Sequence, residues 1–178
     1  MTRIVLVRHC ESSGQTPEAP LTETGHVQAL QLVERLSSLA IDHIVSSPYA
    51  RARATIQPFA THTGLPVHLD DRLAERRISP EPIANWRDFV RRSFDDPDAR
   101  APGGESGRET LARAWAAIET VLNGGRRLPV VVGHGQSLGL VLHSIDPGFG
   151  YAGWEALRNP DVYLLESKHD RAFTFTQV

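Results

Sequence analysis

Five side chains whose types suit phosphoryl transfer follow short apolar stretches of the chain. Arg8 and His9 come directly after one apolar run, His134 follows another, Arg51 lies just past a third, and Glu75 stands six residues beyond a fourth. Guanidinium and imidazole groups present donors that match the three equatorial oxygens of a phosphoryl group. An imidazole can also act as the nucleophile, and a carboxylate can protonate a departing alkoxide. These residues predict phosphoryl transfer if the fold brings them together.

The alternation of strands and helices along the chain predicts how these five residues come together. Apolar runs without polar alternation are typical of buried parallel strands, and stretches with helical spacing lie between most of them. The expected strands are residues 2–7, 41–45, 67–69, 128–133, 162–165 and 172–176, and the expected helices begin near residues 22, 48, 83, 106 and 135. This order predicts a three-layer α/β/α sandwich with a mostly parallel central sheet. Because ligands bind beyond the carboxyl ends of such strands, Arg8-His9 and Gly133-His134 should meet there.

Length and composition predict a single domain, residues 1–178, and exclude several classes of function. Apolar residues make up 40% of the 178, which is enough for one sizeable core. The formal charge of −2 argues against a general nucleic-acid binder, which needs a basic surface. The apolar runs are far shorter than the about 20 residues of a membrane helix, and the one cysteine cannot form an internal disulfide. We expect a soluble, cytoplasmic protein with no membrane or nucleic-acid partner. The sequence leaves the oligomeric state open, a homodimer included.

Residues 76–104 interrupt the alternation and are predicted to form an insertion, or cap, over the sheet edge. Four prolines surround one expected helix near residues 83–94. Six arginines between residues 72 and 92 have two interpretations. They form either a solvated charged face or a basic rim, including Arg76, Arg77 and Arg87, that selects substrates with more than one anionic group.

Six segments form an ordered set of motifs. The first is Leu6-Val7-Arg8-His9-Cys10-Glu11-Ser12, and the others are residues 21–29, 46–55, 73–75, 102–106 and 131–135. Together they resemble the signatures of the histidine phosphatase superfamily, in its phosphoglycerate mutase-like branch. The first segment is similar to that family's Leu-Val-Arg-His-Gly-Glu-Ser motif. The resemblance runs in family order over nearly the whole chain, which makes it far more specific than any one motif.

The resemblance implies a role for each of the five residues. His9 would attack phosphorus and become a phosphohistidine. Glu75 would protonate the leaving group and then help water to attack the phosphoenzyme. Arg8, Arg51 and His134 would bind the phosphoryl oxygens.

Two more residues join the predicted phosphate site. Gln15 stands where the family often has an Asn that contacts phosphate, and it keeps the amide group. Gly135 follows His134, and a small residue there lets backbone amides approach an anion at a helix start. The resemblance implies no metal and no cofactor, because the arginines neutralise the charge of the phosphoryl group.

Departures from the family pattern favour a phosphatase over a mutase. After Glu75 the mutase-type Gly-x-Trp-Glu-Gly pattern is missing, and residues 76–80 stand in its place. Mutases of the family are also longer, in keeping with a fuller lid that keeps water out. We therefore expect hydrolysis of a small phosphorylated metabolite, with mutase-type phosphotransfer as the alternative. Cys10 stands where Gly is usual, which places an oxidisable thiol beside the pocket.

A serine esterase is a rival interpretation. Gly135–Gly139 has the Gly-x-Ser-x-Gly spacing of a nucleophile elbow around Ser137. Either Asp146 or Asp161, followed by His169, would complete the Ser, Asp, His order. Few residues remain after Ser137 to deliver those partners, and this interpretation leaves the amino-terminal Arg-His pair unexplained.

Two other rivals involve the same pocket. A cysteine phosphatase needs Cys-x₅-Arg, but counting on from Cys10 gives Thr16, so that chemistry fails. A phosphoester-binding module without turnover is the non-enzymatic alternative, and trapping of a phosphoenzyme would separate it from an enzyme.

Overall fold

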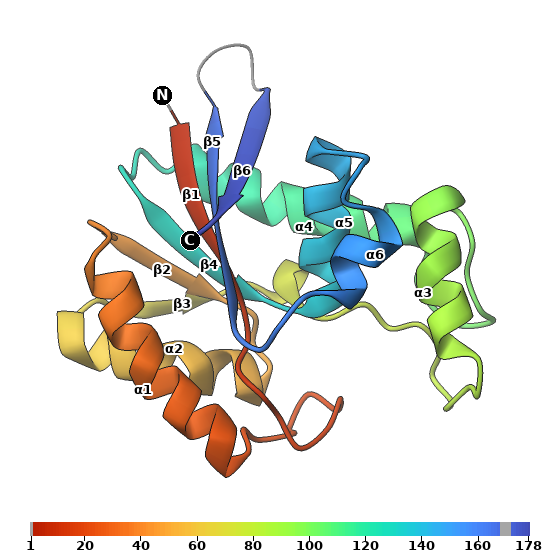
Figure 1. The fold of residues 1–178 in the computed structure, drawn as a ribbon, viewed down its shortest axis with the longest axis horizontal. Coiled ribbons are helices and arrows are strands. Elements are labelled where there is room, and N and C mark those ends of the chain that lie inside the picture. Colours follow the sequence, from red (N-terminus) through yellow and green to blue (C-terminus); the bar gives the residue numbers. More distant parts are fainter. Residues whose placement is uncertain (1, 168–171) are drawn as a thin grey trace.

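Six strands form one sheet in the order β3-β2-β4-β1-β5-β6 (Figure 1). The computed structural model describes residues 2–167 and 172–178. The strands are β1 (Thr2–Arg8), β2 (His43–Ser46), β3 (Val67–Leu69), β4 (Pro129–Gly133), β5 (Asp161–Ser167) and β6 (Phe173–Gln177). Neighbouring strands from β3 to β1 are parallel, whereas β5 runs antiparallel to both β1 and β6. The predicted mostly parallel sheet is confirmed.

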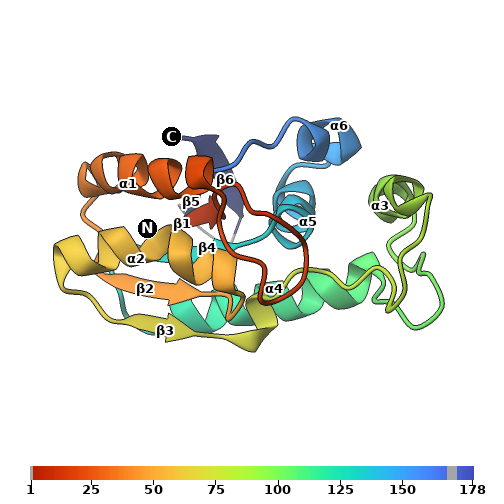
Figure 2. The same cartoon turned by 90° about the horizontal axis from the view of Figure 1, so that it is seen from below.

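Helices cover both faces of the sheet, as predicted (Figure 2). They are α1 (Glu23–Ser37), α2 (Ala50–Thr63), α3 (Trp86–Asp95), α4 (Gly107–Leu122), α5 (Gly135–Ile145) and α6 (Gly150–Glu155), with a 3₁₀ turn η1 (Asp71–Leu73) after β3. Helices α1 and α2 lie on one face, and α4 lies on the opposite face. Within the described residues, every helix is too short or too polar to cross a membrane.

Alternating side chains of β1 join the two halves of the core. Val5 and Val7 pack with α1 and α2, and Ile4 and Leu6 pack with α4 and α5. All four are fully buried, and each such side chain contributes about 1.5–3 kcal/mol. A strand buried on both faces has no polar alternation, which is why its sequence reads as an unbroken apolar run.

The register between β1 and β4 places Arg8, His9 and His134 at one end of the sheet. Arg8, the last residue of β1, pairs with Gly133, the last residue of β4. The backbone N–H of His9 donates to the Gly133 carbonyl over 3.0 Å. His9 and His134 are therefore the next residues on neighbouring parallel strands, at the same end of the sheet.

Helix starts follow local sequence in most places. The Ser106–Glu109 capping box before α4 forms both of its hydrogen bonds, as its spacing predicts. The helix expected near residue 48 begins two residues later, at Ala50, so Pro48 precedes it. The Ser47 hydroxyl accepts the Tyr49 N–H, and this local bond holds the chain in a turn before the helix.

Helix α3, within residues 76–104, lies beside α5 and α6 rather than over an edge strand, which corrects the prediction for this helix (Figure 1). Aromatic contacts explain the placement, because Trp86 of α3 packs edge-to-face on Trp154 and Phe94 packs on His143. The expected helix in this segment is present as α3.

Arg76 does not belong to a basic rim, contrary to that interpretation. Its side chain is 4% exposed and donates to the carbonyls of Ala99 and Glu105 and to the Ser93 hydroxyl. A guanidinium committed to these acceptors anchors the segment instead of facing a ligand. Arg77 and Arg87 are exposed.

Candidate active site

His9 is held in one tautomer at the carboxyl end of β1. Its Nδ1 lies 2.6 Å from the carbonyl oxygen of Cys10, which can only accept a hydrogen bond. The proton must therefore be on Nδ1, which leaves the lone pair on Nε2. Arg51 donates from Nε to this Nε2 over 3.2 Å. The nucleophilic nitrogen thus faces a guanidinium group, where an anionic phosphoryl group would bind.

Main-chain carbonyls fix the two arginines. Arg51, fully buried at the start of α2, donates through Nη1 to the carbonyls of Gln15 and Thr16 at 3.3 and 2.8 Å. Arg8 donates through Nη1 to the carbonyl of Leu157 at 2.6 Å. Burial lowers the pKa of both guanidinium groups, while the Glu75 carboxylate opposes the shift. Arginine stays charged in proteins, so the site holds two fixed positive charges.

His134 is placed by β4 and by the loop after β2. Its Nε2 lies 2.7 Å from the Ser47 hydroxyl oxygen, which already accepts the Tyr49 N–H at 3.3 Å. The hydroxyl still has a proton that it can donate to Nε2, and in that arrangement the ring proton of His134 sits on Nδ1. The ring centroids of His134 and His9 are 5.2 Å apart. The two imidazoles lie side by side at the ends of β1 and β4.

Three buried nitrogen atoms of these residues have no hydrogen-bond partner among the described residues. They are Arg8 Nε, Arg51 Nη2 and His134 Nδ1. Buried donors without partners are rare, because each loses its hydration without compensation. An anion that accepts all three would remove that penalty, and a phosphoryl group has three equatorial oxygens to offer.

Both imidazoles are neutral at neutral pH. Burial lowers the pKa of His9 to about 3, although its hydrogen bond to Cys10 acts in the opposite direction. Burial also lowers the pKa of His134 well below the usual range, and the neighbouring His9 and Arg51 add to this effect. A neutral His9 keeps the Nε2 lone pair that an attack on phosphorus requires.

Glu75 caps the amino terminus of α5 and lies near both arginines. Its carboxylate oxygens each accept a backbone N–H at 3.1 Å, from Gln136 and Ser137, and one also accepts the Arg76 N–H at 2.8 Å. The side chain of His134, the N-cap residue of α5, makes no cap hydrogen bond. The Glu75 carboxylate instead accepts the backbone N–H groups that the first turn of a helix leaves without a partner. Glu75 is thereby joined to the strand-end that carries His134.

Gly135 is the first residue of α5, and its lack of a side chain makes room for Arg8. A Cβ atom at this position would lie 3.2 Å from both Cζ and Nε of Arg8. This distance is tighter than ordinary van der Waals contact. The absence of a side chain at Gly135 therefore leaves the space that the Arg8 guanidinium group occupies.

Gln15 and Cys10 are placed differently from the other predicted residues. Gln15 is exposed, and its contact with the site is the carbonyl oxygen that binds Arg51. Cys10 is fully buried beneath the site, and burial raises the pKa of its thiol to about 11. A protonated, buried thiol is not readily oxidised, so the structure argues against the expected oxidation of this thiol.

Two further residues, Thr55 and Asn159, support the site through hydrogen bonds. The Thr55 hydroxyl accepts the Cys10 N–H at 2.9 Å and donates to the Arg51 carbonyl at 2.7 Å. Asn159 donates its side-chain amide to the His9 carbonyl at 2.6 Å. Thr55 lies one helical turn after Arg51, which is a weak clue, whereas Asn159 comes from a distant loop and leaves none.

The serine-esterase residues do not assemble among the described residues. The Ser137 hydroxyl donates to the main-chain carbonyl of His134 at 3.4 Å. Asp146 caps the far end of α5, and Asp161 binds Arg158 and Gln177. His169 lies outside the described residues.

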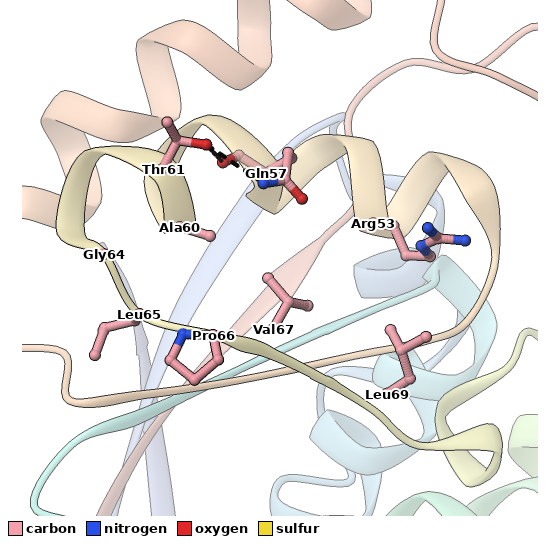
Figure 3. A pocket seen from close by; sticks show the side chains of 9 residues that line it. All are labelled: Arg53, Gln57, Ala60, Thr61, Gly64, Leu65, Pro66, Val67 and Leu69. Carbon is pink, nitrogen blue, oxygen red and sulfur yellow. Dashed lines mark hydrogen bonds between the residues drawn. The ribbon is translucent and has the colours of Figure 1, made fainter.

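A separate cleft of about 440 Å³ lies between α2 and β3 (Figure 3). It is lined by Arg53, Gln57, Ala60, Thr61, Gly64, Leu65, Pro66, Val67 and Leu69. None of the five predicted reaction residues lines it, so it is distinct from the histidine site. Across residues 2–167 and 172–178, no group of three His, Cys, Asp or Glu side chains is arranged to hold a metal ion.

Comparisons with known proteins agree with this geometry. Residues 4–176 match the family model described as the histidine phosphatase superfamily (branch 1). The probable phosphoglycerate mutase GpmB of Cronobacter sakazakii is 34% identical, with 82% of this chain and 75% of that protein covered. The protein of the same name from Salmonella choleraesuis is also 34% identical, with 89% and 80% covered.

Solved structures share the fold at lower identity. A mycobacterial glucosyl-3-phosphoglycerate phosphatase superposes with a TM-score of 0.79 at 23% identity, over 100% of this chain and 97% of that one. A variant of phosphoserine phosphatase from Entamoeba histolytica, in complex with phosphoserine, gives a TM-score of 0.74 at 21% identity, over 99% and 95% of the two chains.

Proposed function

The chain belongs to the histidine phosphatase superfamily, and from that premise we propose that it hydrolyses phosphomonoesters of small metabolites through a phosphohistidine on His9. The observation that carries the proposal is the tautomer of His9. Its Nδ1 proton is bound to the Cys10 carbonyl, so the Nε2 lone pair points toward Arg51. A buried, neutral imidazole next to fixed guanidinium groups is equipped to attack an anionic phosphoryl group.

The first step transfers the phosphoryl group to the enzyme. When substrate binds, the Arg51 Nε–H releases Nε2 of His9. The freed Nε2 lone pair forms an N–P bond while the ester P–O bond breaks, and the electron pair of that P–O bond leaves with the alkoxide oxygen. A protonated Glu75 gives that oxygen its proton. Arg8, Arg51 and His134 bind the three equatorial oxygens through the donors that have no other described partner.

The second step returns the enzyme to its starting state. A water molecule attacks phosphorus, the N–P bond breaks, and its electron pair returns to Nε2 of His9. Glu75 takes the proton that the water loses, so it is again ready to act as an acid. Inorganic phosphate is the second product.

We propose that this reaction needs no metal ion. The positive charge that stabilises the transition state comes from Arg8 and Arg51, whose guanidinium groups are already fixed by main-chain carbonyls. Activity that is unchanged after treatment with a chelator is the expected result. Activity that is lost with the chelator and restored by a divalent cation would contradict this part of the proposal.

A mutase is the second candidate, because the relatives at 34% identity are named as probable phosphoglycerate mutases. In a mutase the phosphohistidine would be attacked by a hydroxyl of the bound acid instead of by water. The two products are different, so the ratio of free phosphate to isomerised phosphoester separates the candidates. We expect free phosphate to dominate.

The test is phosphate release across a panel of small phosphomonoesters, with His9→Ala and Ser137→Ala as paired variants. We expect the His9 variant to lose at least about 10³-fold in kcat, and the Ser137 variant to keep most of its activity. Acid-quenched wild type should carry labelled phosphate on His9. Binding of phosphoesters without any trapped phosphoenzyme would instead support a non-catalytic module.

A further inference from the structure

We infer that Arg113, held by Glu105, is a positioning residue for the proton transfers that the proposed function assigns to Glu75. Arg113 lies on α4, which packs against the η1 turn that directly precedes the Glu75 segment. It does not contact the imidazoles, and it acts through the main chain of Glu75. This inference rests on the proposed function and adds a residue to it.

The Arg113 guanidinium group binds three main-chain carbonyls in the segment that ends at Glu75. Nη1 donates to the carbonyls of Arg72 and Ala74 at 2.8 and 2.6 Å, and Nη2 reaches the carbonyl of Glu75 at 3.3 Å. The same group forms a two-point ion pair with Glu105, with distances of 2.8 and 2.9 Å. One side chain thus fixes the backbone immediately before the carboxylate.

Glu105 also binds the main chain that follows Glu75. One of its oxygen atoms accepts the backbone N–H of Arg77 at 2.9 Å. The Glu105–Arg113 pair therefore holds the chain both before and after Glu75. Its side chains are 23% and 20% exposed, which distinguishes it from the solvated ion pairs that contribute little.

The backbone of Glu75 is thus bound to α4, and its carboxylate is bound to the first turn of α5. The carboxylate accepts the N–H groups of Gln136 and Ser137 directly after His134 and Gly135. An acid must stand within hydrogen-bond reach of the leaving oxygen, and a displacement of about 1 Å can cost about 100-fold in rate. By holding the main chain of Glu75, Arg113 helps to fix the distance from its carboxyl group to the leaving oxygen.

The experiment compares Arg113→Lys with Arg108→Lys in the full-length protein. Lysine keeps the positive charge but lacks the planar fork, so it cannot bind two carboxylate oxygens and three carbonyls together. Arg108 is the matched control, because it lies on the same helix and pairs with Asp98 at 2.7 Å while both side chains are more than half exposed.

Two substrates separate positioning of the acid from general damage. Nitrophenolate leaves without protonation, whereas an alkoxide needs a proton from the acid. We expect Arg113→Lys to lower kcat/KM by about 10-fold or more for a simple alkyl phosphate and much less for p-nitrophenyl phosphate. Glu105→Gln should shift the ratio in the same direction, and Arg108→Lys should leave both values unchanged.

A double variant tests whether Arg113 acts through Glu75. In a Glu75→Gln background, Arg113→Lys should cause almost no further loss with the alkyl phosphate, because residues that act as a unit are not additive. Equal losses for both substrates, or full additivity with Glu75→Gln, would overturn the positioning role. If the His9→Ala variant keeps wild-type turnover, the proposed function fails, and this inference fails with it.

Discussion

Arg51 and His9 are joined by a hydrogen bond of 3.2 Å from the guanidinium Nε to the imidazole Nε2. The bond connects the first residues of α2 to the end of β1, which are 42 positions apart in the chain. It aligns the lone pair of the nucleophile with a fixed positive charge. Catalysis should therefore depend on the shape of the Arg51 side chain as well as on its charge.

Arg51→Lys is expected to lower kcat by about 10²–10³-fold, the range for loss of one donor to a transition-state oxyanion. Lysine keeps the charge, but it cannot bind the Gln15 and Thr16 carbonyls and also face His9. Steady-state kinetics on a phosphomonoester would measure the loss. Arg53→Lys is the control, because Arg53 is exposed on the same helix. Equal activity in the two variants would contradict the role of Arg51.

Much of the site could be predicted from sequence, because strand ends are visible as the ends of apolar runs. Arg8, His9 and His134 each follow such a run, and the register of Arg8 with Gly133 brings them together. Polar residues between an apolar run and a helical pattern likewise mark the end of a strand. The position of Arg51 just after β2 therefore predicts that it lies at the same end of the sheet.

The parts that could not be predicted depend on packing between distant segments. Glu75 caps α5 through amides 61 and 62 positions away, which no local pattern specifies. Arg76 is buried because carbonyls of Ala99 and Glu105 surround it, whereas its sequence context of charged residues suggested an exposed rim. Helix α6 was missed as well, because its two glycines weaken helix propensity and only packing, including the contact of Gly153 with the Phe149 ring, favours it.

Stability should fall as the pH drops from about 6.5 toward 3. His9 has a pKa of about 3 when folded and 6.5 ordinarily, so below pH 6.5 the unfolded chain binds a proton that the folded chain does not. His134 is shifted in the same direction. Each such group lowers the free energy of unfolding by about 1.4 kcal/mol per pH unit within that window, and the full stability is present above it.

Urea denaturation at several pH values between 7 and 5.5 would measure this slope. His134→Gln removes one of the two groups, so its stability should depend less steeply on pH than that of the wild type. His62→Gln, which changes an exposed histidine on α2, should keep the wild-type slope. Identical slopes in all three proteins would show that His134 does not stay neutral in the folded state.

Cys10 should be unreactive in the folded protein. It is fully buried, and the pKa of its thiol is raised to about 11, so little thiolate forms at pH 8. We expect iodoacetamide to alkylate Cys10 quickly in denaturant and at least about 100-fold more slowly without it. Mass spectrometry over time would follow the modification. Rapid labelling of the folded protein would contradict this prediction.

Gly135→Ala should impair catalysis while leaving the fold intact. The added methyl group would lie 3.2 Å from Cζ and Nε of Arg8, and the Leu157 carbonyl restrains the guanidinium group from moving away. Alanine favours the first turn of a helix, so the free energy of unfolding should change by less than about 1 kcal/mol. A displaced Arg8 loses its alignment with the phosphoryl oxygens, and we expect kcat/KM to fall by about 10-fold or more.

Kinetics and thermal unfolding of Gly135→Ala, measured beside Ser144→Ala, would test this argument. Ser144 is exposed farther along α5, where its hydroxyl accepts the Trp115 Nε1–H, so its change to alanine removes a contact of the helix without approaching Arg8. The expected pattern is a loss of kcat/KM in the first variant alone, whereas a lower melting temperature is expected only for the second. Wild-type kinetics in Gly135→Ala would mean that Arg8 can move without loss, and its fixed position could then not be part of the catalytic mechanism.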